Sequence, residues 1–218
     1  MPLLPRIRRI WDLSPAIQSD TPVWPGEAPF AYERTSVLQG DCPVNVSRFS
    51  MCPHTGSHTD APFHYDPLGV PIGRVDLDAY IGPCRVIHAI GAPQIEFRHL
   101  QGKLTALPQR VLFRAYATYP RTGWDSAFAS VAVEVIELLA RCGVKLIGID
   151  TPSLDPELSL TMDAHLAVRR NGMAILESIV LDDVDEGDYE LIALPLKFSE
   201  LDASPVRAIL RSLESGVT

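Results

Sequence analysis

The stretch SVAVEVIELLARCGVKLIGID, residues 130–150, contains the two kinds of element that decide the fold. Ser130 can cap a helix that runs through Val131–Cys142, and Gly143 is a residue type that commonly ends a helix. Val144–Asp150 follows at once as an almost continuous apolar run, which is typical of a strand covered on both faces. The stretch therefore predicts a helix followed by a buried strand in a mixed α/β domain.

Further strand-like segments lie on both sides of this stretch. They are rich in β-branched and aromatic residues or alternate in period two: Val44–Met51, Cys84–Ile90, Arg110–Ala117, Met173–Ile179, Tyr189–Leu194 and Val206–Leu210. A second helix is expected from a cap at Thr161 to about Arg170, and the four prolines within residues 11–29 predict an extended loop. With 19 prolines the chain cannot be all-helical. We expect a single α/β domain over residues 1–218, with more strand than helix.

Composition and charge argue against two classes of binding partner, nucleic acids and membranes. The net charge of −8 and the lack of a basic stripe argue against binding to nucleic acid. The N-terminus has no signal-peptide pattern, and no stretch approaches the roughly 20 apolar residues of a membrane span. We therefore expect a cytoplasmic protein that acts on a small molecule.

One segment carries a dense set of metal-ligand residue types. It reads PHTGSHTDAPFHY over residues 53–65 and holds three of the six histidines. The helical HExxH zinc motif is excluded because Thr55 stands where that motif needs Glu, and the prolines and Gly56 favour a loop. In extended backbone His58 and Asp60 point the same way, and Gly56 permits a tight turn between ligands.

This pattern predicts a catalytic metal site. Two imidazoles and one carboxylate suit zinc or a similar divalent ion and leave a position for water. Because a carboxylate can bridge two ions, His165 and Glu177 are the best further candidates; Glu177 interrupts an apolar strand. The residues alone leave open that these two are an ordinary helix-face histidine and an edge-strand glutamate. Neither a GxSxG nor a GxGxxG motif occurs, so a serine nucleophile or nucleotide binding is not indicated.

The same segment resembles the signature of the cyclase-like metal hydrolase family, His-x-Gly-Thr-His-x-Asp-x-Pro-x-His. Here it stands as HTGSHTDAPFH from His54 to His64, with Ser57 in place of the usual Thr. Other stretches resemble the bacterial kynurenine formamidase (arylformamidase) branch of that family: Trp11–Ser14, Thr21–Gly26, Gly148–Ser153, His165, Glu177, Leu194–Lys197 and Ser204–Arg207. The resemblance extends over nearly the whole chain.

The resemblance implies a swivelling β/β/α fold and two zinc ions per subunit, with manganese or another divalent metal as the alternative. It implies that His54, His58 and Asp60 bind the first ion. Asp60 would bridge to a second ion, which His165 and Glu177 would also hold. It further implies a homodimer.

The implied reaction is hydrolysis of N-formyl-L-kynurenine to L-kynurenine and formate, in tryptophan degradation. Metal-activated water would attack the formyl carbon, with His64 in the family's acid/base place and Trp24 in its substrate-contacting place. Trp24 can also be interpreted as a loop residue that plugs the core. A hydrolase of cyclic amides such as isatin, or a metal-binding module without turnover, remains an alternative, although His64 argues against the second.

Overall fold

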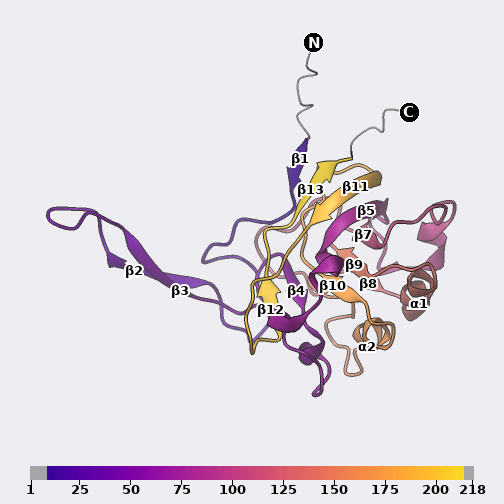
Figure 1. Cartoon of the computed structure of the whole chain (residues 1–218), viewed down its shortest axis with the longest axis horizontal. Helices are drawn as coiled ribbons and strands as arrows, with labels where there is room; N and C mark the ends of the chain where they lie inside the picture. Colours follow the sequence, from indigo (N-terminus) through magenta and orange to yellow (C-terminus); the bar gives the residue numbers. More distant parts are fainter. Residues whose placement is uncertain (1–8, 214–218) are drawn as a thin grey trace, which may run out of the picture.

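A seven-stranded sheet forms the centre of the molecule (Figure 1). The computed structural model describes residues 9–213. The strand order is β1-β13-β11-β5-β7-β9-β10. In that order the strands span Ile10–Asp12, Ile209–Ser212, Gly187–Ile192, Ile81–His88, Arg110–Arg114, Leu146–Ile149 and Ala174–Leu176. The described residues form two α-helices beside these strands, so the fold is mixed α/β with more strand than helix, as the sequence predicts.

The parallel half of the sheet is buried on both faces. Strands β5, β7, β9 and β10 run parallel, and every residue of β9 is buried. Helices α1 (Val133–Arg141) and α2 (Asp163–Arg170) pack on one face through Ile136, Leu139 and Val168. This confirms the predicted helix and doubly covered strand of residues 130–150.

The other half of the sheet is antiparallel and joins the two ends of the described chain. β1 pairs with β13, β13 with β11, and β11 with β5. Leu13 and Leu181 from loops and Tyr80 from a 3₁₀ helix cover the second face of the sheet and contribute to its other core. Residues from both ends of the sequence therefore close one sheet.

Several predicted boundaries are wrong. Ser130 does not cap α1, because it belongs to the short strand β8 (Ser130–Val131), which pairs with β6 (Gln94–Ile95); Ala132 holds the cap position. Thr161 does not cap α2 either, since Met162 occupies that position with a left-handed φ of 52°. In both places pairing or loop geometry outweighs the local capping preference.

The C-terminal strand prediction also needs correction. Instead of one strand over Val206–Leu210, the chain forms β12 (Ala203–Pro205) and β13. β12 pairs antiparallel with β4 (His58–Asp60), in a separate two-stranded ribbon. This pairing holds the C-terminal segment against the histidine-rich segment. Residues 9–213 also include four short 3₁₀ helices, namely η1 (Pro62–His64), η2 (Ile72–Arg74), η3 (Leu77–Tyr80) and η4 (Phe97–Leu100).

Strands β2 (Ala31–Ser36) and β3 (Val46–Ser50) form an antiparallel hairpin that projects from the body (Figure 1). The sequence predicts β3 but not β2. Nearly every residue of the two strands is exposed. We call residues 31–50 the arm. Within residues 9–213, no helix has the length and apolar character that crossing a membrane requires.

Candidate metal centre

The histidine-rich segment is held between two neighbouring chain segments. On one side β4 pairs with β12; on the other, the backbone of His58 exchanges hydrogen bonds of 3.2 and 2.9 Å with that of Glu177, one residue beyond β10. Gly56 has a φ of +66° and makes the turn that the sequence predicts before β4. Because His58 and Asp60 lie in extended backbone two residues apart, both side chains point to one side.

In three histidine rings, the outer nitrogen, which faces away from Asp60, donates a hydrogen bond to an oxygen atom. His58 Nδ1 donates to the Gly56 carbonyl at 2.9 Å. His165 Nδ1 donates to Asp155 Oδ2 at 2.6 Å, and His54 Nε2 donates to Asp202 Oδ2 at 2.9 Å. Such contacts on the outer nitrogen set the tautomer and ring orientation of metal-binding histidines.

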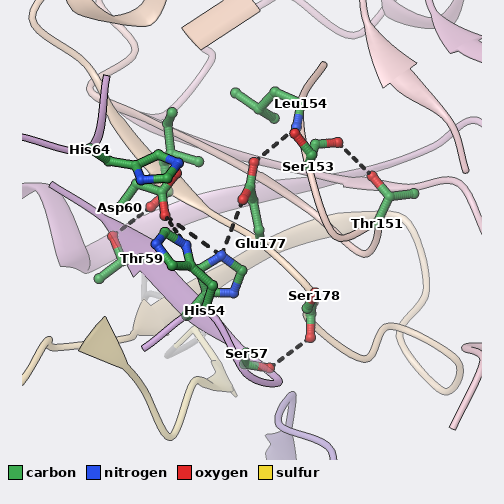
Figure 2. A network of polar contacts seen from close by, with 12 residues as sticks. His54, Ser57, Thr59, Asp60, His64, Thr151, Ser153, Leu154, Glu177 and Ser178 are labelled. Atoms are coloured by element: carbon green, nitrogen blue, oxygen red, sulfur yellow. Dashed lines mark hydrogen bonds and ion pairs between the residues drawn. The ribbon is translucent and has the colours of Figure 1, made fainter. Parts of the chain in front are cut away.

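The inner nitrogens of these rings converge on two carboxylates, Asp60 and Glu177, which Figure 2 shows beside His54. His54 Nδ1 lies 3.1 Å from Asp60 Oδ1, and His58 Nε2 lies 3.6 Å from the same oxygen and 3.2 Å from Glu177 Oε2. His165 Nε2 lies 3.4 Å from Asp60 Oδ2 and 3.7 Å from Glu177 Oε1. All five residues predicted to hold metal are therefore brought together, with Asp60 between the rings.

Hydrogen bonding within the protein does not satisfy this cluster. Asp60 is 2% exposed, yet neither carboxylate oxygen has a hydrogen-bond partner, and His58 Nε2 has none. These are three of the six buried side-chain polar atoms without a partner in the described part of the chain. Burying such atoms unpaired is costly, whereas a divalent cation would satisfy all three. The donor set therefore fits a metal ion.

Two overlapping groups have ligand atoms within 4.8 Å of one another: His54, Asp60 and His64, and His58, Asp60 and Glu177. The first group includes His64, which the sequence interpretation keeps outside the ligand set. The second group places His58 with Glu177, whereas the family resemblance implies that His58 shares an ion with His54. The geometry thus gathers the predicted residues without assigning each to one ion.

The charges of the cluster stabilise one another. Burial alone would raise the pKa of Asp60, but the nearby imidazole rings of His165 and His54 hold that pKa well below its usual value. Burial opposes charge on His54, yet Asp202 and Asp60 raise its pKa to about 11. Burial likewise opposes charge on His165, whose pKa Asp155 and Asp60 raise to about 10. The site is therefore built to place positive charge beside Asp60.

His64 lies at the end of η1 on the outer side of the cluster. Its side chain is 31% exposed, whereas that of His58 is 2% exposed. His64 Nδ1 donates to Asp202 Oδ2 at 3.2 Å, and its ring centroid is 4.4 Å from that of His54 and 6.2 Å from that of His165. A ring at the rim of the cluster, with one nitrogen held, can exchange protons with a bound molecule.

A cavity of about 280 Å³ opens onto the cluster, and Trp24 is part of its wall. The Trp24 ring also packs edge-on against Trp124 and Phe128, with centroid distances of 5.3 and 6.0 Å. Trp24 thus contributes both to the cavity and to the packing beneath it. Both of the interpretations of Trp24 drawn from the sequence are compatible with this position.

Two residues in the cluster carry no signal that sequence reasoning could use. Asp155, besides holding the His165 ring, accepts the backbone N–H groups of Ala164 and His165 in the first turn of α2. Asp202 lies 148 residues from His54 and 138 from His64, and it contacts both. Only the folded chain brings these carboxylates to the site.

Comparison with known proteins agrees with this geometry. A potential metal-dependent hydrolase with cyclase activity is 26% identical, with a TM-score of 0.80, over 95% of this chain and 99% of that one. Two isatin hydrolases have the same fold: the A form of Labrenzia aggregata, bound to benzyl benzoate (24% identity, TM-score 0.81, 95% and 94% coverage), and that of Ralstonia solanacearum (23%, 0.80, 94% and 92%). The family model named Cyclase matches residues 11–156, which is most of the chain and includes the histidine-rich segment. The protein therefore belongs to the Cyclase family.

Proposed function

We propose that the protein is a metal-dependent amide hydrolase that converts N-formyl-L-kynurenine and water into L-kynurenine and formate. One observation carries the proposal: three histidines, each fixed on its outer nitrogen, face two buried carboxylates at the end of a cavity that includes Trp24. Such a site suits hydrolysis of a stable amide bond. The sequence resemblance to kynurenine formamidases supports the choice of substrate.

The candidate ligands are those that the sequence predicts: His54, His58, Asp60, His165 and Glu177. A divalent metal, zinc in our proposal, would polarise the formyl oxygen and make water nucleophilic at neutral pH when bound there. Glu177 is further oriented by the backbone N–H of Leu154, which donates to its Oε1 at 2.8 Å. These contacts keep the ligand set in one arrangement.

His64 would move the protons of the reaction. Water must lose a proton as it adds to the formyl carbon, and the aniline nitrogen must gain one as the C–N bond breaks. An imidazole at the rim of the cluster can do both in turn, because its ring nitrogen can accept a proton and then donate it. The Trp24 ring would contact the aryl group of the substrate.

Hydrolysis of a cyclic amide such as isatin is the second candidate. The fold similarity to two isatin hydrolases favours it, since isatin is also an aromatic amide. It requires the same chemistry, with ring opening in place of formate release. The two candidate reactions therefore require the same metal ligands, and they differ in the substrate that the cavity must accept.

Parallel assays of metal-loaded protein with the two substrates, followed by absorbance, test the proposal. We expect N-formyl-L-kynurenine to have the higher kcat/KM, and a chelator to abolish both activities. Trp24→Ala should raise KM for N-formyl-L-kynurenine far more than for a small formamide, because only the aryl substrate loses stacking area. A higher kcat/KM for isatin would replace the proposed substrate, and turnover of neither compound would reject both.

We also propose that a second copy of the chain is the partner of the arm. One face of the arm carries Tyr32 and Phe49, whose ring centroids lie 6.0 and 6.1 Å from that of Phe30, the residue just before the arm. The opposite face carries the Glu33–Arg48 ion pair of 2.7 Å. A lone two-stranded hairpin is marginally stable in water, so an amphipathic one needs a surface to cover.

The body of the same chain offers such a surface. Leu158 and Leu160 are 88% and 98% exposed and lie between the acidic residues Glu157 and Asp163, which suit Arg34 on the arm. In a two-fold dimer the arm of each copy would contact the body of the other, so this contact would occur twice. Counting the rings of both copies and the surfaces that they would cover, the two contacts would bury on the order of 1,000 Å² in total. Specific protein interfaces begin at about this size.

A further inference from the structure

One carboxylate connects two histidines of the site that have different proposed roles. Asp202 Oδ2 lies 2.9 Å from His54 Nε2 and 3.2 Å from His64 Nδ1. His54 is a candidate metal ligand, and His64 is the candidate proton-transfer residue. No other described carboxylate contacts the His64 ring.

The backbone of Asp202 is fixed by the strand pairing beside it. Its carbonyl accepts the Ala61 N–H at 2.8 Å, and Ala203, the next residue, pairs with Asp60 in the β12–β4 ribbon. The carbonyl of the preceding residue, Leu201, accepts the Ile72 N–H at 2.9 Å. The carboxylate is therefore held in place by ordered backbone on both sides.

This placement determines which nitrogen of His64 is free. An ionised carboxylate only accepts hydrogen bonds, so the nitrogen facing it must carry a proton. Nδ1 of His64 is then N–H, and Nε2 of the neutral ring keeps its lone pair for the substrate side. The same reasoning gives His54 an Nε2–H and leaves its Nδ1 directed at Asp60.

We propose that Asp202 is a positioning residue that holds His64 in the Nδ1–H tautomer and turns its Nε2 toward the substrate. The inference rests on the proposed function for the role of His64 but not for the tautomer itself. Asp202 corresponds in role to Asp155, which holds the His165 ring in the same manner. Asp155 contacts one candidate ligand, His165, whereas Asp202 contacts both a candidate ligand, His54, and the proposed proton-transfer residue, His64.

Asp202→Leu tests this directly, because leucine is close to aspartate in size but offers Nδ1 no hydrogen-bond acceptor, whereas asparagine could still accept through its Oδ1. Long-range ¹H–¹⁵N spectra of zinc-loaded protein with ¹⁵N-labelled histidine report the tautomer, with His64→Ala used to assign the signals. We expect the Nδ1–H form of His64 in the wild type and a shift toward the Nε2–H form in the variant. Loss of an orienting partner should also lower kcat at least about tenfold while changing KM less.

Asp66→Leu is the matched control. Asp66 is two residues from His64 and is largely buried, but it pairs with Arg169 at 2.7 Å and contacts no histidine ring. The control should leave the tautomer of His64 and kcat close to those of the wild type. Asp202→Glu, which keeps the acceptor, should retain the Nδ1–H form and recover part of kcat.

The outcomes separate this inference from the proposed function. If His64 has the same tautomer in the wild type and in Asp202→Leu, the inference is wrong, whatever happens to activity or metal content. If the tautomer changes but the wild type hydrolyses neither substrate, the positioning role stands and the proposed function fails. A wild-type ring already in the Nε2–H form would also overturn the inference.

Discussion

Asp60 and Asp150 are both 2% exposed carboxylates, but their surroundings shift their pKa values in opposite directions. Asp60 faces imidazole rings, which hold its pKa well below the usual value. Asp150 accepts only the backbone N–H groups of Ala115 and Tyr116, and burial raises its pKa to about 7. At the scale of single residues, Asp60 is kept charged where a cation would bind, whereas Asp150 is favoured in its neutral form.

His165 tests the two-ion arrangement at this scale. It is the only predicted ligand that comes from a helix, and its Nε2 faces both Asp60 and Glu177. We expect metal analysis to give about two equivalents for the wild type and about one for His165→Ala, since the second ion loses its imidazole ligand. His99→Ala, at a histidine that caps η4 away from the site, should keep two equivalents. Two equivalents in His165→Ala would remove His165 from the ligand set.

Asp150 gives a pH-dependent prediction for stability. Its pKa in the folded protein, about 7, lies above its ordinary value of 3.8. Between these values the unfolded chain releases this proton and the folded protein retains it, so stability falls as pH rises, by at most about 1.4 kcal/mol per pH unit.

Asp150→Asn has no such proton. The free energy of unfolding of the wild type, relative to that of Asp150→Asn, should therefore decrease between pH 4 and 7 in denaturant titrations. Parallel curves for the two proteins over that range would show that Asp150 keeps an ordinary pKa.

The residues alone predict a site most clearly where they are close together in the chain. His54, His58, Asp60 and His64 fall within eleven residues, so their types and spacing suffice to suggest a metal site. Asp202 lacks such a signal because its role depends on the β12–β4 pairing, which involves residues far apart in sequence.

At the scale of elements, strand β9 shows how tightly the sheet beside the site is packed. Gly148 lies between Leu112 on β7 and Leu176 on β10. A Cβ atom at Gly148 would approach Leu112 Cδ2 to 2.5 Å and the Leu176 carbonyl oxygen to 3.3 Å. Since β10 leads directly into Glu177, this close approach also sets the position of a candidate ligand.

Gly148→Ala should therefore destabilise the protein by about 1–3 kcal/mol through overpacking, as measured by denaturant unfolding. Leu112→Ala would remove the side-chain atom in the way. In that background, adding Gly148→Ala should cost clearly less than it does alone. An equal cost in both backgrounds would mean that Leu112 is not the source of the strain.

Element types are predictable here, but their ends are not. The apolar run of residues 144–150 predicts a buried strand because its signal extends over the whole segment. Ser130 and Thr161 are good capping residues by type, yet strand pairing and a left-handed residue move the helix starts beyond them. A single-residue preference is too weak to resist such contacts.

At the scale of the whole molecule, the arm is the feature least explained by one chain. Tyr32 and Phe49 are 57% and 63% exposed on a hairpin that projects from the body (Figure 1). In the sequence the arm lies between Trp24 and His54, two residues that line the cavity of the candidate site.

Light scattering coupled to gel filtration tests the proposed dimer. We expect about twice the mass of 24.0 kDa for the wild type and a monomer for the double variant Tyr32→Glu, Phe49→Glu, since charges on the ring face oppose its burial. Glu33→Gln, on the polar face of the arm, should remain dimeric. A monomeric wild type at micromolar concentration would contradict the proposal.

The central claim, that the buried cluster is the centre of a metal-dependent amide hydrolase, is tested most directly by titrating zinc into chelator-treated protein. Formate release from N-formyl-L-kynurenine is followed at each addition. We predict no release without metal and a rise that saturates near two equivalents per chain, because the two oxygens of Asp60 face different histidines and could each contribute to holding an ion. Formate release that persists undiminished in metal-free protein would contradict the account.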